Sequence, residues 1–240
     1  MILELKSVSK EYGNEILVHN VNMKVNEGEI VGLIGPNGAG KTTIMKMICG
    51  VTNPSEGVIE INQKSIDYWK SLGEMPVNSI IETPTMYNHL SGYLNLEIEA
   101  LMKGIEKTKI RETCNRVIAD VGLDVQKRKK VKKYSLGMKQ RLGIAMTMIN
   151  SPKLVILDEP INGLDPEGIN YVRNYIRELS EQKVAVVISS HILNELEKVC
   201  DKLYFIQKGE IVKMIYKRDF NNNLDELYEQ IIKYKGTENE

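Results

Sequence analysis

The chain has 240 residues, of which 42% are hydrophobic and 27% are charged, a composition typical of a soluble globular protein. Its 32 basic residues balance 32 acidic ones, which excludes a global positive charge that would draw the chain to nucleic acid or anionic membranes. No apolar run approaches the about 18 residues that cross a bilayer, and the N-terminus lacks the apolar core of a signal peptide. The sequence therefore predicts a cytosolic protein.

The first third of the chain predicts strands around a single helix. Residues 2–8 and 16–25 alternate polar and apolar side chains, which indicates two strands of an antiparallel sheet. An apolar run at 29–34 is typical of a buried strand, and a helix is expected from about residue 41 to residue 49, before Gly50. Two further strands are predicted at 57–61 and 79–81.

The middle of the chain has a helical pattern. Three helices are predicted over residues 91–103, 108–121 and 135–149. The first two end at Gly104 and Gly122, glycines of the kind that terminate helices.

Strands return after this helical block. Residues 154–157 form an apolar strand, and Asp165 with Pro166 marks the start of a helix, as N-cap and first helical residue. Residues 184–189 indicate another buried strand. The last predicted elements are a hairpin over 203–206 and 210–214 and a helix over 224–234.

Buried strands that alternate with helices predict an α/β fold, with a mostly parallel sheet covered by helices on both faces. The alternating N-terminal strands add an antiparallel β layer. We expect one domain over residues 1–216, with a helical subdomain of about 84–151 inserted in it, and a charged C-terminal tail of 217–240.

Residues 35–42 match the phosphate-binding pattern G-x-x-x-x-G-K-[ST] and lie between a predicted strand and a predicted helix. The glycines let backbone N–H groups point at phosphate oxygens, and the helix start adds partial positive charge. Lys41 is expected to reach the β- and γ-phosphates of ATP, and the Thr42 hydroxyl to bind Mg²⁺. The candidate ATP-binding residues of the loop are Gly35, Asn37, Gly38, Ala39, Gly40, Lys41, Thr42 and Thr43.

Three further polar residues follow apolar strands. Asp158 and Glu159 come after the strand at 154–157, and His191 follows the strand at 184–189. Because the carboxyl ends of parallel strands meet in one crevice, we expect these side chains near the phosphates. Asp158 is the candidate to hold Mg²⁺ and Glu159 the base that accepts a proton from the attacking water. His191 is the candidate either to hydrogen-bond the γ-phosphate or to orient that water. The alternative is a surface Asp-Glu pair that only caps a strand.

Together these motifs resemble the ATP-binding-cassette (ABC) family over residues 1 to 215, which implies a P-loop NTPase of the ABC cassette fold. Tyr12 matches the aromatic residue that stacks on adenine in this family. Asp165, in the segment Asn-Gly-Leu-Asp, matches the loop that crosses to the partner subunit, and His191 matches the switch histidine. The family signature, usually Leu-Ser-Gly-Gly-Gln, corresponds here to Tyr134 followed by Ser135, Leu136, Gly137 and Met138.

The resemblance implies a head-to-tail dimer, with identical or different cassettes, in which each signature closes on the ATP held by the other subunit. The sequence itself shows only that Ser135 is a good N-cap for a helix whose start can receive an anion.

Two motifs depart from the family pattern, the signature and the loop before the helical insertion. Leu136 replaces the first signature glycine and Met138 the final glutamine. Glu82 stands in the loop that couples the sheet to the helical insertion, where most family members have glutamine; it can approach Mg²⁺ but has lost the donor of an amide. The alternative is that Glu82 is only a solvated loop residue. The Glu-Thr-Pro sequence at 82–84 resembles the cassettes of exporters for lantibiotic and bacitracin-like peptides.

The resemblance implies the ATPase of a membrane exporter that gives immunity or resistance to such peptides. Its partners would be ATP, Mg²⁺, a second cassette and permease subunits that hold it at the inner face of the cell membrane. The alternatives are a soluble cassette without a permease, for example in cofactor assembly, and a phosphotransferase. No nucleic-acid partner is predicted, since the basic run at 127–133 lacks interleaved aromatic residues.

Overall fold

The computed structural model describes residues 1–82, 85–220 and 224–234. In this part of the chain, single 3₁₀ turns lie at Asp124–Gln126, Val131–Lys133 and Lys217–Asp219. The strands are β1 Leu3–Tyr12, β2 Glu15–Val25, β3 Ile30–Ile34, β4 Glu56–Ile61, β5 Lys64–Ser65, β6 Val77–Ile80, β7 Leu154–Leu157, β8 Ala185–Ser190, β9 Lys202–Gln207 and β10 Glu210–Tyr216. The helices are α1 Lys41–Ile48, α2 Ile66–Ser71, α3 Gly92–Met102, α4 Lys107–Asp120, α5 Leu136–Thr147, α6 Pro166–Glu181, α7 Leu193–Glu197 and α8 Leu224–Tyr234.

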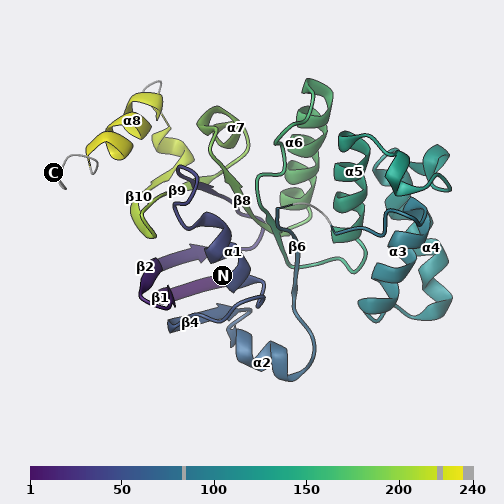
Figure 1. The fold of residues 1–240 in the computed structure, drawn as a ribbon, viewed down its shortest axis with the longest axis horizontal. Coiled ribbons are helices and arrows are strands. Elements are labelled where there is room, and N and C mark those ends of the chain that lie inside the picture. Colours follow the sequence, from purple (N-terminus) through teal and green to yellow (C-terminus); the bar gives the residue numbers. More distant parts are fainter. Residues whose placement is uncertain (83–84, 221–223, 235–240) are drawn as a thin grey trace.

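Two sheets form the framework of the molecule (Figure 1). The larger sheet has the order β10-β9-β3-β8-β7-β6, and every neighbouring pair in it except β10–β9 runs parallel. The smaller sheet, β2-β1-β4-β5, is antiparallel. The predicted α/β fold, with a mostly parallel sheet and an N-terminal antiparallel layer, is therefore confirmed.

The central strands of the larger sheet supply two hydrophobic cores, one on each face. In β3, Val31 and Leu33 pack with β1, β2, β4 and α1, whereas Ile30 and Ile34 face the core that contains α3 to α6. All four side chains are at most 4% exposed. This alternation follows from the two-residue period of a strand, and it explains why the sequence of β3 is a continuous apolar run.

Three helices, α3, α4 and α5, gather at the opposite end of the molecule from β1 and β2 (Figure 1). Ser91 caps α3 by accepting a hydrogen bond from the backbone N–H of Leu94 at 3.2 Å. Gly104 and Gly122 follow α3 and α4 in the left-handed conformation, with φ of +70° and +67°. The helices predicted in this block are thus present, with ends shifted by one or two residues.

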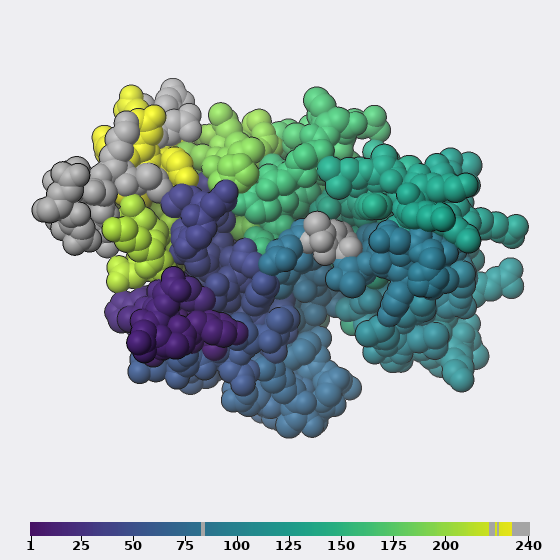
Figure 2. All heavy atoms as spheres, in the orientation of Figure 1, coloured from purple at the N-terminus to yellow at the C-terminus, as the bar shows by residue number. Residues whose placement is uncertain are grey.

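The elements that the sequence pattern missed are short. Helix α2 has six residues and is capped by Ser65, whose hydroxyl accepts a hydrogen bond from the Tyr68 backbone N–H at 3.2 Å. Helix α7 has five residues, and β5 has two. Figure 2 shows a hollow between α2 and the α3–α4 end of the molecule, and a cavity of about 750 Å³ there is lined in part by Trp69, Met75 and Met102.

The predicted C-terminal helix is α8, and it packs against the side of the larger sheet that α7 also covers. Leu224 is 3% exposed, and the rings of Phe205 in β9 and Tyr228 in α8 lie 6.4 Å apart between centroids. None of the helices in the described part of the chain has the length and apolar character needed to span a membrane.

Candidate functional site

The loop between β3 and α1 is shaped by glycines that no other residue could replace without strain. A Cβ atom added to Gly35 would lie 2.2 Å from the carbonyl oxygen of Ile206, and one added to Gly40 would lie 3.0 Å from the carbonyl oxygen of Leu17. Gly40 also has a φ of +103°, a value that favours glycine. The loop is therefore pressed against β2 and β9, and its backbone is fixed by the surrounding sheets.

This loop wraps a cavity of about 280 Å³. Tyr12 is not among its walls; it is 63% exposed at the end of β1, just before the turn into β2. The cavity is lined by Leu17, Asn37, Gly38, Ala39, Gly40, Lys41, Thr42, Thr43 and Glu159.

Lys41, the first residue of α1, is only 6% exposed. Its ammonium group donates hydrogen bonds to the carbonyl oxygens of Gly35 at 2.7 Å and Pro36 at 3.0 Å, and it lies 3.7 Å from Oε1 of Glu159. Burial lowers the pKa of Lys41, and the carboxylates of Glu159 and Asp158 oppose that shift. The cavity therefore contains a fixed cation in front of the loop amides.

Asp158 follows β7 and contacts Thr42, one of the residues that line the cavity. The Thr42 hydroxyl donates a hydrogen bond to Asp158 Oδ2 at 2.7 Å, and the Ser189 hydroxyl donates one to Asp158 Oδ1 at 2.5 Å. Asp158 is 2% exposed. A carboxylate and a hydroxyl are the hard oxygen ligands that Mg²⁺ prefers, and a magnesium site at a nucleotide needs only one or two protein ligands besides phosphates and water.

Glu159, the next residue, turns its side chain toward the phosphate loop. Its φ of +48° is unusual for a residue other than glycine, and its backbone N–H donates to the Ser189 hydroxyl at 2.9 Å. His191, which follows β8, places Nδ1 3.0 Å from Glu159 Oε2. Glu159 thus contacts both Lys41 and His191, and its proximity to His191 is what the shared edge of parallel strands led us to expect.

Ser189 is a site residue that the sequence interpretation missed. It lies in β8, two residues before His191, and its hydroxyl joins the Asp158 carboxylate to the Glu159 backbone. A hydroxyl residue at the carboxyl end of a buried strand, beside a suspected catalytic histidine, was the only available signal.

Ser189→Ala is expected to lower the free energy of unfolding by about 2 kcal/mol, because a buried hydrogen bond to a charged group is lost. It should also lower kcat, since both Asp158 and Glu159 lose an anchor. Urea denaturation and phosphate-release assays measure the two effects. Ser180→Ala is the matched control. Ser180 lies near the C-terminal end of α6, and its hydroxyl donates a hydrogen bond to the carbonyl of Gly28 at 2.6 Å. Loss of this hydrogen bond should leave kcat unchanged. Equal kcat losses in the two variants would contradict the role given to Ser189.

The predicted signature residues lie away from this cavity, at the start of α5. The hydroxyl of Ser135 accepts a hydrogen bond from the Met138 N–H at 3.2 Å, which confirms Ser135 as the N-cap. Leu136 is 54% exposed, and a Cβ at Gly137 would meet no other atom within 4 Å. Residues 135–138 therefore present an open helix start to their surroundings.

Two other predicted residues also lie apart from the cavity. Asp165 caps α6, with Oδ1 accepting from the Gly168 N–H at 2.8 Å, so the predicted helix start is confirmed. The Glu82 carboxylate forms an ion pair with Lys46 of α1 at 2.7 Å, and its side chain is 64% exposed. In this arrangement Glu82 does not contact Thr42 or Asp158.

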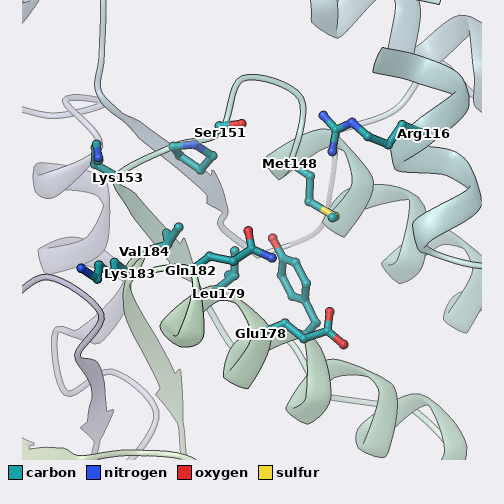
Figure 3. Close-up of a pocket in the computed structure, with 11 residues that line it drawn as sticks. Arg116, Met148, Ser151, Lys153, Glu178, Leu179, Gln182, Lys183 and Val184 are labelled. Carbon is teal, nitrogen blue, oxygen red and sulfur yellow. The ribbon is translucent and has the colours of Figure 1, made fainter. Parts of the chain in front are cut away.

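A second cavity, of about 200 Å³, lies at the opposite edge of the larger sheet, where β7 and β8 begin (Figure 3). Tyr175 and Leu179 of α6 contribute to its walls, and Arg116 of α4 stands at its margin. It includes none of the residues of the candidate site.

Comparison with known proteins agrees with this geometry. The sequence pattern of the family described as ABC transporter matches residues 18–162. The lantibiotic transport ATP-binding protein SrtF of Streptococcus pyogenes is 41% identical over 234 residues, which cover 98% of this chain and 99% of that protein. The bacitracin transport ATP-binding protein BcrA of Enterococcus faecalis is 40% identical over 97% of this chain and 73% of its own length.

Solved structures share the fold. The ATP-binding subunit of an ABC transporter superposes with a TM-score of 0.87 at 29% identity and covers 97% of this chain and 100% of its own. A dimeric ATP-binding cassette in a post-hydrolysis state with ADP and Pi has a TM-score of 0.81 at 23% identity, covering 91% of this chain and all of its own. The phosphate loop, the carboxylates that face it and these similarities lead to one conclusion: the chain belongs to the ABC transporter family.

Proposed function

We propose that this chain hydrolyses ATP to drive a membrane exporter of antimicrobial peptides. The observation that carries the proposal is the single cavity in which the phosphate loop, Lys41 and Glu159 meet. The protein is an ATPase of the ABC type. Transport of lantibiotic and bacitracin-like peptides is proposed because the relatives SrtF and BcrA are named for these cargoes.

The proposed chemistry follows from the residues that line the cavity and from two residues outside its walls, Tyr12 and His191. Backbone N–H groups of the loop and the Lys41 ammonium would bind the phosphates of ATP, and Tyr12 would stack on the adenine. Glu159 would accept a proton from the attacking water, because its carboxylate is beside the loop and is not bonded to the Thr42–Asp158 pair. The contact of 3.0 Å with His191 supports a role for that histidine in orienting Glu159 and the water.

Thr42 and Asp158 fit a Mg²⁺ ion that accompanies ATP. Their oxygens are hard ligands held together, and among the described residues no group of three or more His, Cys, Asp or Glu side chains forms a complete metal cage. The remaining ligands would come from phosphates and water. When bound there, Mg²⁺ would neutralise charge that develops on the phosphates. Glu82 becomes a candidate ligand only if it leaves Lys46.

We further propose that two cassettes pair head to tail. The start of α5, at Ser135 to Met138, and the loop that ends at Asp165 would contact ATP held by the second subunit. Their separation from the cavity of their own chain supports this division, as does the exposure of the α5 start.

The permease is proposed to dock on the helical block near Glu82 and the hollow between α2 and α3, which would hold the chain at the inner face of the membrane. In this view residues 1–216 make one ATPase domain, residues of about 84–151 form its inserted helical subdomain, and 217–240 form a tail. The similarity to SrtF over nearly all of both chains favours this view over a soluble cassette without a permease.

Two measurements test the proposal. Purified protein should release phosphate from ATP when Mg²⁺ is present, and EDTA should stop the release. Copurification from bacterial membranes should recover a polytopic membrane protein with the cassette. A purely soluble complex would overturn the exporter assignment, whereas release of a phosphorylated product in place of free phosphate would overturn the hydrolase assignment.

A further inference from the structure

The signature segment and the Asp165 loop are in direct contact, although 27 positions separate Leu136 from Gly163 in the sequence. Gly163 has a φ of +71°, and a Cβ added to it would lie 3.0 Å from Cδ2 of Leu136. The side chain of Leu136, which occupies the position of a signature glycine, therefore lies over the turn that leads to Asp165.

A second contact joins α5 to α6, and these two helices stand side by side (Figure 1). Arg141 of α5 places Nη2 3.0 Å from Oε1 of Glu167, in the first turn of α6. Its guanidinium carbon lies 4.8 Å from the ring centroid of Tyr171. Glu167 and Tyr171 are four residues apart and so share one face of α6, which means that Arg141 is fixed along that face at two points.

The two halves of the Arg141 contact differ in strength. The Glu167 side chain is 83% exposed, so water screens its ion pair and the pair stabilises little. The Arg141 side chain is only 26% exposed, and burial raises the pKa of Tyr171 while Arg141 opposes the rise. An arginine stacked on a ring that is largely shielded from water is held in one orientation. The stacking on Tyr171 therefore contributes more than the ion pair.

We propose that Leu136 and Arg141 are positioning residues that hold the start of α5 against the start of α6, so that Ser135 and Asp165 face the second subunit as one rigid surface. This inference rests on the head-to-tail dimer of the proposed function. It gives Leu136 a role: the side chain adds a contact inside the subunit at a position where the usual family signature has a glycine, which has no side chain to make one.

The test measures ATP-dependent dimerisation in a Glu159→Gln background, which retains ATP. Analytical ultracentrifugation with ATP and Mg²⁺ gives the dimer dissociation constant, and a fluorescent ATP analogue gives the nucleotide affinity of dilute monomer. We expect Leu136→Ala and Arg141→Lys each to weaken dimerisation by about 10- to 100-fold, as a misplaced contact surface does. The affinity of the monomer for nucleotide should not change, because its own cavity is intact.

Two further variants separate this role from simpler ones. Glu167→Gln removes the exposed half of the Arg141 contact and should leave dimerisation within about twofold. Leu136→Gly restores the family residue and should weaken dimerisation as Leu136→Ala does. For the Leu136 and Arg141 variants, dimerisation as tight as in the parent would overturn the role of the residue that was changed. Parallel loss of nucleotide affinity and melting temperature would show a general structural role and would also overturn it. If the parent itself fails to dimerise with ATP, the proposed dimer fails, and this inference fails with it.

Discussion

Glu159→Gln is expected to lower kcat for ATP hydrolysis by about 10²- to 10⁴-fold, the range of a lost general base. Glutamine preserves the size of the side chain and can still contact His191, so the change removes the proton acceptor and little else. The carboxylate lies 3.7 Å from the Lys41 ammonium and 3.0 Å from His191 Nδ1, and 20% of the side chain is exposed. It is therefore placed to accept a proton from a water molecule beside the phosphates.

Phosphate release under saturating ATP measures this effect, and a fluorescent ATP analogue checks that nucleotide binding persists. Glu181→Gln, at the exposed end of α6, is the control, since it removes one carboxylate far from the phosphate loop. Hydrolysis by the Glu159→Gln variant at the rate of this control would mean that another group is the base.

Lys41→Met is expected to raise the dissociation constant for ATP by about 10- to 100-fold, because hydrogen bonds to a charged group contribute about 1.5–3 kcal/mol. Methionine fills a similar volume but removes the cation that faces the loop. Because Lys41 is 6% exposed and its pKa is lowered by burial, little water is available to replace its contact with phosphate. Isothermal titration calorimetry measures the affinity, and the melting temperature checks the fold.

Lys46→Met provides the comparison for this variant. Lys46 lies on the same helix, but its partner is the exposed Glu82 carboxylate, and its own side chain is 38% exposed. Its loss should change ATP affinity by less than about threefold. If both lysine variants lost affinity equally, general positive charge on α1, and not the placement of Lys41, would account for binding.

Much of the fold was predictable because its signals are local. The strand before the phosphate loop is a continuous apolar run, α6 begins with an Asp-Pro pair, and the helix over 224–234 has a clear apolar stripe. Helices α2 and α7 were missed because five or six residues make fewer than two turns, too few to establish a period.

For the site, the sequence could predict which strand each residue follows, but not the contacts that its side chain makes. Because Asp158, Glu159 and His191 follow parallel strands, their convergence follows from topology. The Ser189 bridge and the Lys46–Glu82 ion pair were not predictable, since side-chain contacts between distant segments depend on tertiary packing. The structure describes Glu82 but not residues 83–84, so the rest of the predicted Glu-Thr-Pro segment lies outside the described residues.

The position of β3 in the middle of the larger sheet has a consequence for local unfolding. Its five residues are buried and pair with β8 on one side, and four of them pair with β9 on the other. Segments of this kind open only when the whole protein opens, whereas helices at the margin fray at little cost. The phosphate loop therefore begins at one of the fully buried inner strands of the larger sheet, so nucleotide can enter and leave while its binding backbone keeps its shape.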